Sequence, residues 1–208
     1  MTVILDGTAT RHPISPVHDG IVAAIGSTPI VRLDRLFRTA GSTVLAKVER
    51  VNPGGSTKDR PAREMVEAAL AEGRAVPGVT TIVESSSGNL GVALALVCAY
   101  HRLGLHVVTD PKASHTNLAI MRALGAQVDI VTDRDPATGE FLPTRLRRVQ
   151  ELLASIPGAL CLDQYSNPSG AAAHRRTARE ILDATGEPDL LFIAAGSCGS
   201  LRGIADHL

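Results

Sequence analysis

One turn in the sequence reads Asn52-Pro53-Gly54-Gly55-Ser56-Thr57-Lys58-Asp59-Arg60-Pro61-Ala62. Residues 44–51 before it predict a strand. Apolar side chains at helical spacing after it predict a helix that begins just beyond Lys58 and ends before Gly73. Pro61 suits the first turn of that helix, because the amide that proline lacks would have no partner there. The sequence therefore predicts a strand–turn–helix unit with Lys58 at the positive end of a helix dipole.

This position affects the chemistry of Lys58. The field at a helix amino end disfavours an ammonium group and favours the neutral amine, which a lysine needs to form an imine with a carbonyl compound. Most lysines beside helix starts are solvated surface charges, and the turn alone favours that simpler interpretation. The rest of the chain decides between the two.

Composition excludes several classes of protein. The 208 residues carry 21 Lys+Arg and 21 Asp+Glu and only 2% aromatic residues, so neither charge nor base stacking favours nucleic acid. Cys98, Cys161 and Cys198 have no C-x-x-C spacing, and His101 and His106 are a poor ligand pair, so we expect no disulfide framework and no metal site. With no signal peptide and no long apolar run, we predict a soluble cytoplasmic protein without membrane contact.

Strands and helices alternate along the chain. The patterns predict a turn that runs into a short strand at residues 26–33, and strands at residues 44–51, 80–84, 105–109, 128–132, 159–163 and 189–194. They predict further helices at residues 90–100, 117–124, 143–154, 175–184 and after 200. The helix at 90–100 is apolar almost all round and should be buried. Residues 7–20 read as a mobile lead-in. This alternation predicts an α/β fold with right-handed crossovers and mostly parallel sheets.

Two more strand-to-helix junctions consist of small residues, Ser86-Ser87-Gly88-Asn89 and Gly196-Ser197-Cys198-Gly199-Ser200. Free amides at a helix start, reached through glycine and serine, can hold an anion. Neither junction is a Walker loop. Each alone is weak evidence, because tight strand-to-helix turns commonly need small residues for packing. One lysine, one phosphate cradle and one carboxylate cradle together indicate a pyridoxal phosphate enzyme that acts on an amino acid.

Four motifs resemble, in order and spacing, those of the cysteine synthase family: residues 52–60, 86–89, 164–168 and 196–200. The third reads Gln164-Tyr165-Ser166-Asn167-Pro168, and the resemblance extends from Gly26 to Gly203. It implies a fold-type II enzyme, similar to the tryptophan synthase β subunit, with two three-layer domains. The enzyme would bind pyridoxal 5'-phosphate and form a homodimer. Residues 1–52 and 158–208 would belong to a larger cofactor domain. Residues 53–157 would form a smaller, mobile domain, and a C-terminal part of the larger domain would be absent.

The resemblance also implies a role for each motif. Lys58 would form the imine with the cofactor and shuttle the proton at the substrate Cα, and Asn89 would bind the cofactor's ring oxygen. The substrate carboxylate would be held by Ser86, Ser87, Gly88, Asn89 and Gln164. The cofactor phosphate would be held by Gly196, Ser197, Cys198, Gly199 and Ser200. An O-activated L-serine would lose its β-substituent and leave an α-aminoacrylate for a nucleophile to attack.

Some details resemble one subgroup, which joins O-phospho-L-serine to L-glutamate to make N-(2-amino-2-carboxyethyl)-L-glutamate, a step toward 2,3-diaminopropionate for siderophores and peptide antibiotics. These are Leu90 after Asn89, Pro61, and residues 136–152. A phosphoserine dianion needs cationic partners, so Arg145 is the hypothesised contact, and Tyr165, beside Gln164, could donate its hydroxyl to the same phosphate or to the second substrate. A solvated basic face at Arg145, Arg147 and Arg148 and a core tyrosine are equally compatible with the pattern.

Other interpretations stay open. Cysteine synthase activity with O-acetyl- or O-phosphoserine and sulfide is the first, an inactive cofactor-binding or regulatory fragment the second, and a nucleotide-binding α/β domain the third. Cys198 stands where the family usually has glycine, and we interpret it as a small packing residue. His174 stands where the resembling enzymes also have histidine, and we expect it to be packed and hydrogen-bonded.

Overall fold

The computed structural model describes residues 17–37 and 41–208, so most of the lead-in predicted at 7–20 lies outside the described residues. Its main sheet has four parallel strands in the order β5-β4-β3-β6. These strands are β3 (Thr81–Ser85), β4 (Gly104–Thr109), β5 (Gln127–Ile130) and β6 (Ala159–Leu160). Because β4 and β6 flank β3, their carboxyl ends meet at one edge of the sheet, where α/β proteins bind ligands.

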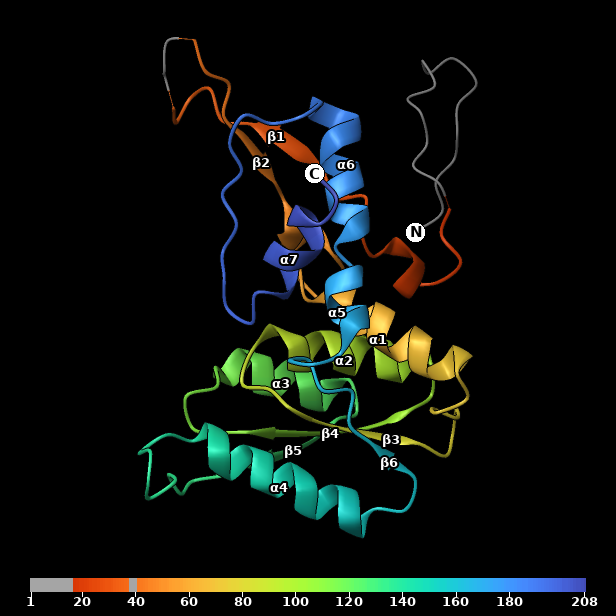
Figure 1. Cartoon of the computed structure of the whole chain (residues 1–208). Helices are drawn as coiled ribbons and strands as arrows, with labels where there is room; N and C mark the ends of the chain where they lie inside the picture. The colour runs from red at the N-terminus through yellow and green to blue at the C-terminus, as the bar shows by residue number, and fades with distance from the viewer. Residues whose placement is uncertain (1–16, 38–40) are drawn as a thin grey trace.

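Helices cover both faces of this sheet (Figure 1). One face carries α1 (Asp59–Ala71), α2 (Asn89–Tyr100) and α3 (His115–Ala123), and the other carries α4 (Leu142–Ser155). Local sequence explains the ends: Gly73 follows α1 with φ +69°, and the Ser114 hydroxyl caps α3 by accepting from the Asn117 amide at 3.1 Å. The predicted three-layer α/β arrangement is confirmed.

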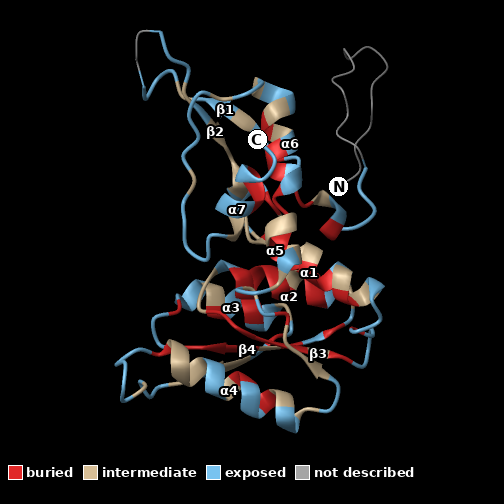
Figure 2. Cartoon of the chain, in the orientation of Figure 1, coloured by how far each residue is buried: buried red, intermediate tan, exposed pale blue. Residues whose placement is uncertain are grey.

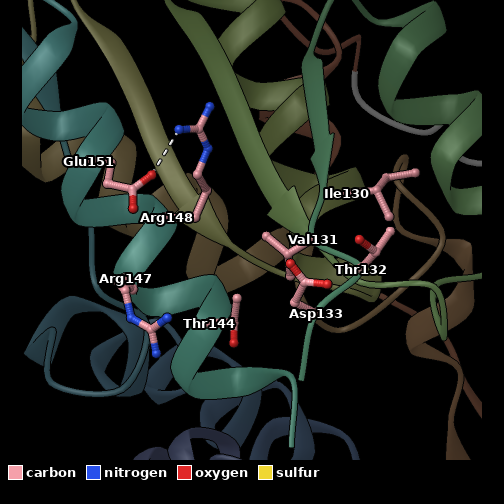
Figure 3. Close-up of a pocket in the computed structure, with 8 residues that line it drawn as sticks. All are labelled: Ile130, Val131, Thr132, Asp133, Thr144, Arg147, Arg148 and Glu151. Atoms are coloured by element: carbon pink, nitrogen blue, oxygen red, sulfur yellow. Dashed lines mark hydrogen bonds and ion pairs between the residues drawn. The ribbon is translucent and has the colours of Figure 1, made fainter. Parts of the chain in front are cut away.

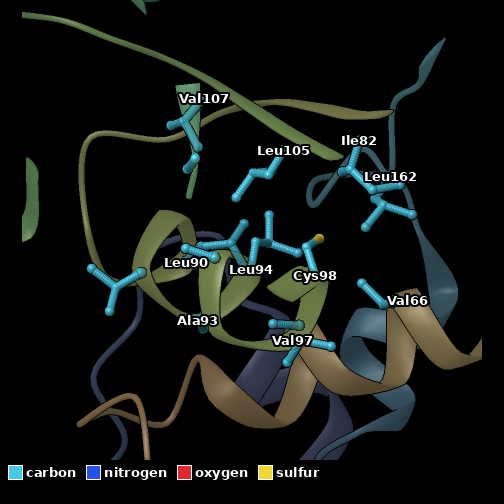
Figure 4. Close-up of a cluster of buried hydrophobic side chains, with 14 of the residues drawn as sticks. Val66, Ile82, Leu90, Ala93, Leu94, Val97, Cys98, Leu105, Val107 and Leu162 are labelled. Carbon is cyan, nitrogen blue, oxygen red and sulfur yellow. The ribbon is translucent and has the colours of Figure 1, made fainter. Parts of the chain in front are cut away.

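The core lies between the sheet and α2, which is buried on nearly all sides as its composition predicts (Figure 2). Leu94 and Val97 of α2 meet Val66 of α1 and Leu105 and Val107 of β4 in one apolar cluster (Figure 4). Burying each of these side chains stabilises the fold by about 1.5–3 kcal/mol before the entropy cost of ordering is counted. The strand and helix ends that carry the polar loops therefore stand on a rigid base.

The remaining elements lie above α1 in Figure 1. They are η1 (Val22–Ala24), β1 (Ile30–Arg32), β2 (Leu45–Lys47), η2 (Glu49–Val51), α5 (Pro168–Ala172), α6 (Arg175–Thr185) and α7 (Gly199–Ala205). Strands β1 and β2 form an antiparallel pair, and α5 packs between α1 and α7. Within the described residues, no helix is long and apolar enough to cross a bilayer.

Three predicted strands are wrong in extent or existence. The strand at 44–51 ends at Lys47, because residues 49–51 coil into η2. The strand at 159–163 ends at Leu160, and Asp163 takes a left-handed φ of +51° that breaks extended pairing. Residues 189–194 form no strand: Phe192 is 92% exposed, and this segment pairs with none of the described strands.

Candidate active site

The turn before Lys58 is fixed by side chains of its own motif. Asn52 accepts from the Gly26 amide at 2.8 Å and donates to the Ser56 carbonyl at 3.1 Å. The Ser56 hydroxyl accepts from the Lys58 amide at 3.1 Å. Gly55 has φ +85°, a backbone conformation that favours glycine. Lys58 therefore stands on a constrained turn one residue before α1, as the sequence predicts.

The Lys58 amine is half-buried, and burial lowers its pKa from the ordinary value. The predicted bias toward the neutral amine is thus present, with desolvation as its cause. Nearby, His174 is buried with Nδ1 3.2 Å from the Thr177 hydroxyl oxygen, so the expected packed, hydrogen-bonded histidine is confirmed. Burial, then the Arg60 charge, lowers the pKa of His174 to about 4, and the Lys58 charge adds to this effect. His174 is therefore a neutral neighbour of Lys58.

The residue after Lys58 is a buried acid. Asp59 is completely buried and accepts a short hydrogen bond from the Gly54 amide. Its Oδ1 atom has no hydrogen-bond partner among the described residues. Burial raises the pKa of Asp59 to about 6, the Gly54 amide opposes that rise, and the Glu49 carboxylate adds to it. A Cβ on Gly54 would lie 2.6 Å from Oδ1, so this acid needs glycine at the turn.

Arg60 ties the turn to the upper part of the molecule. Its side chain is 1% exposed and lies 2.8 Å from a Glu49 oxygen and 2.7 Å from a Glu180 oxygen. Glu180 also lies 2.7 Å from the Lys47 amine and accepts from the Ser27 amide at 2.9 Å. One buried network therefore joins the start of α1 to η2, β2 and α6.

The loop at residues 86–89 lies at the carboxyl edge of the sheet. The Ser86 amide donates to the Val108 carbonyl at 3.0 Å, and the Ser86 hydroxyl accepts from the Gly91 amide at 3.0 Å. Gly88 precedes α2, and nothing lies within 4 Å of the Cβ it lacks. Ser87 is half-buried and Asn89 is exposed at the first position of α2. The loop thus offers helix-start amides beside open space.

The glutamine segment reaches the same edge. The Gln164 side chain donates to the Ser85 carbonyl at 3.5 Å, directly before the loop at 86–89. The structure therefore brings together two motifs that are about eighty residues apart in sequence. Tyr165 is 59% exposed, so its interpretation as a core tyrosine is wrong.

Arg145 also lies at this edge. Its Nε atom is 3.3 Å from an Asp110 oxygen, and the two side chains are 12% and 5% exposed. Asp110 directly follows β4, so the pair sits beside the loop that follows β3. Arg147 pairs with Asp135 at 3.0 Å and Arg148 with Asp129 at 2.7 Å. All three arginines pair with carboxylates, but only Arg145 is largely buried, so the expected solvated basic face holds for Arg147 and Arg148 and not for Arg145.

A cavity of about 240 Å³ lies between the end of β5 and α4 (Figure 3). It is lined by Ile130, Val131, Thr132, Asp133, Thr144, Arg147, Arg148 and Glu151. An Arg148–Glu151 ion pair of 2.9 Å crosses its wall. None of the predicted cofactor or substrate residues lines this cavity, so it is separate from the edge formed by the loop at 86–89, Gln164 and Arg145.

The predicted phosphate loop leads into α7, which begins at Gly199. Cys198 is exposed, so its interpretation as a packing residue is wrong. Its φ of +59° lies in the left-handed region, which explains why glycine suits this position in the resembling family. Nothing lies within 4 Å of the Cβ that Gly196 lacks. A Cβ on Gly203 would lie 1.9 Å from the Ala171 carbonyl oxygen, so glycine lets α7 seat closely on α5.

These residues fit pyridoxal phosphate. A half-buried amine with a lowered pKa can form the imine, and two glycine-containing loops leave open space at helix starts for anionic groups. The residues that sequence reasoning missed are the supporting ones, Glu49, Glu84, Asp110 and Glu180. Only Glu84 carries a signal in the sequence, as a charged residue directly after the apolar Ile82 and Val83 of β3.

Comparisons with known proteins agree with this site. The family model described as "Pyridoxal-phosphate dependent enzyme" matches residues 21–208. An N-(2-amino-2-carboxyethyl)-L-glutamate synthase of Ralstonia nicotianae is 47% identical over 190 residues, which are 90% of this chain and 56% of that protein. A synthase of the same name from Cupriavidus metallidurans is 43% identical over 194 residues, 92% of this chain and 56% of that protein.

A solved structure of a hydrogen sulfide-producing enzyme from Fusobacterium nucleatum matches with a TM-score of 0.85 and 31% identity, covering 94% of this chain and 63% of that one. The similarity in fold agrees with the fold-type II expectation. The chain spans about half the length of the curated relatives it matches. It belongs to the family of pyridoxal-phosphate dependent enzymes.

Proposed function

We propose that this chain carries the lysine-bearing part of an enzyme that joins O-phospho-L-serine to L-glutamate and forms N-(2-amino-2-carboxyethyl)-L-glutamate. The observation that carries the proposal is the 43–47% identity to two synthases of that name over nine-tenths of the chain. Arg145, held by Asp110 at the carboxyl edge of the sheet, supports phosphoserine as the activated serine.

In this proposal Lys58 moves the proton at the substrate Cα. Pyridoxal phosphate, when bound, withdraws electrons from that carbon and so makes its proton acidic. A half-buried amine with a lowered pKa can accept the proton at neutral pH, because more of it is unprotonated than of a solvated lysine. The amides of residues 86–89 and the Gln164 side chain would bind the substrate α-carboxylate and so direct the Cα–H bond toward Lys58.

Arg145 and Tyr165 would bind the phosphoryl group that leaves. A guanidinium offers five N–H donors, so the Asp110 carboxylate orients Arg145 and leaves donors for a phosphoryl oxygen. The exposed Tyr165 hydroxyl follows Gln164 directly and would donate to the same group or to the second substrate. The loop at 196–200 would bind the cofactor phosphate.

The proposal includes a cytoplasmic homodimer and two domains. Residues 1–52 and 158–208 would belong to a larger cofactor domain, and residues 53–157 would form a smaller, mobile one. Strand β6 lies in the range of the larger domain but pairs with β3 of the smaller one, so it would connect the two. Sedimentation of the purified protein tests the dimer directly.

The activity is tested by incubating the cofactor-loaded protein with O-phosphoserine or O-acetylserine, each with L-glutamate or sulfide, and identifying products by mass spectrometry. We expect N-(2-amino-2-carboxyethyl)-L-glutamate only in the mixture that contains both O-phosphoserine and L-glutamate. Cysteine from O-acetylserine and sulfide, without that product, would instead identify a cysteine synthase. Cofactor binding with no product in any mixture would indicate an inactive fragment.

The Arg145 assignment has its own test. Replacing Arg145 with Ala should raise the KM for O-phosphoserine by about tenfold or more, because a charge-assisted contact of roughly 1.5–3 kcal/mol is lost. Arg147→Ala, on the same helix and paired with the exposed loop at Asp135, is the matched control and should leave the KM unchanged. Unchanged turnover of O-phosphoserine by Arg145→Ala would refute the assignment.

A further inference from the structure

A buried carboxyl lies where β3 meets the glutamine segment. Glu84 is 3% exposed, within a strand whose neighbours Ile82 and Val83 are fully buried and apolar. Removing a neutral polar group from water without a hydrogen-bond partner costs on the order of 2–7 kcal/mol, and an ionised carboxylate costs more. The donors around Glu84 therefore indicate what the residue is for.

Those donors come from two separate segments. The Ser85 amide donates to Oε1 at 3.0 Å, from the same strand. From the other segment, the Cys161 Sγ atom lies 4.0 Å from Oε2. Burial raises the pKa of Glu84 to about 7, and the nearby Asp163 carboxylate adds to that rise. Hydrogen bonding from the Ser85, Asp163 and Gln164 backbone opposes it. One side chain thus bridges the end of β3 and the turn after β6.

The turn after β6 needs such support. Asp163 has φ +51°, a left-handed conformation that costs a residue other than glycine roughly 1–2 kcal/mol. The Asp163 side chain accepts from the Tyr165 amide at 3.2 Å and from the Ser166 hydroxyl, which closes the turn on its outer side. On its inner side, the turn faces the Glu84 carboxyl, through Cys161 and the Asp163 and Gln164 backbone. The reversal at Asp163 is what directs the Gln164 side chain back to the Ser85 carbonyl.

We propose that Glu84 is a positioning residue that holds the turn at Asp163 and Gln164 against the end of β3, and so places the Gln164 amide beside the loop at residues 86–89. The contact between the two segments is a property of the fold. Its consequence for substrate rests on the proposed function, in which Gln164 and this loop bind the α-carboxylate.

Amide hydrogen exchange of the whole chain tests the contact without any activity measurement. In Glu84→Ala, the amides of residues 161–167 should exchange about tenfold faster or more, a loss of roughly 1.4 kcal/mol of local protection. Glu84→Gln keeps one acceptor oxygen and should show a smaller increase in the same residues. Exchange in α1 should stay unchanged, and the exposed Glu187→Gln should match the wild type throughout.

Glu84→Gln decides the question if Glu84→Ala does not fold. Unchanged exchange at residues 161–167 in Glu84→Gln, or an increase spread evenly over all elements, would overturn the proposal. The first result would show that the turn is stable without Glu84. The second would show that Glu84 contributes to the stability of the whole fold and not to the turn in particular.

Kinetics of the cofactor-loaded protein test the consequence. In Glu84→Gln the KM for O-phosphoserine should rise by about fivefold or more with kcat lowered less than about twofold, because binding of the carboxylate is weakened before the chemistry is affected. A fall in kcat at constant KM would overturn the positioning role. If the wild type turns over no substrate, the proposed function fails, and the exchange experiment still decides whether Glu84 holds the turn.

Discussion

The Nη2 atom of Arg60 lies 2.7 Å from Oε2 of Glu180, although 120 residues separate the two in the chain. Arg60 stands in the first turn of α1, two residues after Lys58, and Glu180 stands in the middle of α6. The pair is buried and shared with Glu49 and Lys47. The orientation of the lysine turn is therefore fixed partly by a helix from the far end of the sequence.

Removing one member of this network should destabilise the fold strongly. Glu180→Ala leaves the Arg60 charge buried and short of a partner, so we expect a loss of about 3–5 kcal/mol in the free energy of unfolding, measured by urea denaturation. Glu187→Ala removes an exposed acid just after the same helix and should cost less than about 0.5 kcal/mol. Equal losses in the two variants would show that the ion pair does not stabilise the turn.

The contribution of Glu180 to the free energy of unfolding should be lost at acidic pH. Burial raises its pKa, but hydrogen bonds from Arg60 and Lys47 outweigh burial and lower the pKa to about 2, from an ordinary value of 4.5. Because the folded pKa is depressed, the stabilisation is complete above pH 4.5 and is lost as the pH falls toward 2. The difference in unfolding free energy between wild type and Glu180→Ala should therefore shrink from pH 6 to pH 3. A difference that stays constant would contradict this.

The contribution of Asp59 to folding stability should depend on pH in the opposite direction. Its folded pKa of about 6 is raised above the ordinary 3.8, so its favourable contribution is complete below pH 3.8 and is lost as the pH rises through 6. Asp59→Asn is neutral at every pH. Its unfolding free energy relative to wild type should improve by about 2–3 kcal/mol between pH 3.5 and pH 7.5. A relative stability independent of pH would show that Asp59 is ionised normally.

The sequence could predict local structure because local patterns determine it. The predicted strand at 80–84 and helix at 90–100 agree with β3 and α2 within a residue, since their apolar residues have no alternative to burial. The Lys58 turn was predictable from its own glycines and serines, whose hydrogen bonds are made within the motif or to nearby residues.

Partnerships across the chain were not predictable in the same way. Nothing near Arg145 indicates that Asp110 will pair with it, because the pairing depends on α4 packing beside the end of β4. Residues 189–194 have strand composition but pair with none of the described strands, and a strand exists only when it is paired with a neighbour. The buried Glu84 shows the same limit, since one of its two donors, the Cys161 thiol, lies on a segment about eighty residues away.

The seating of α7 on α5 should control cofactor affinity. In Gly203→Ala the new methyl would meet the Ala171 carbonyl at 1.9 Å, so α7 and the loop at 196–200 must shift. If that loop holds the cofactor phosphate, the affinity for pyridoxal phosphate, measured by fluorescence titration, should fall by about tenfold or more. Arg202→Ala changes an exposed residue of the same helix and should bind normally. Normal binding of pyridoxal phosphate by Gly203→Ala would show that α7 is not part of the cofactor site.

The central claim is that Lys58 carries the cofactor, and the sequence makes it easy to test because it contains only three lysines, Lys47, Lys58 and Lys112. Lys47 lies 2.7 Å from a Glu180 oxygen, and Lys112 lies exposed near Glu140. The cofactor-loaded protein is reduced with borohydride, digested and examined by mass spectrometry. The account predicts the reduced cofactor on the peptide with Lys58, and no such adduct in Lys58→Ala. An adduct on Lys47 or Lys112 of the wild type, or on none of the three, would contradict it.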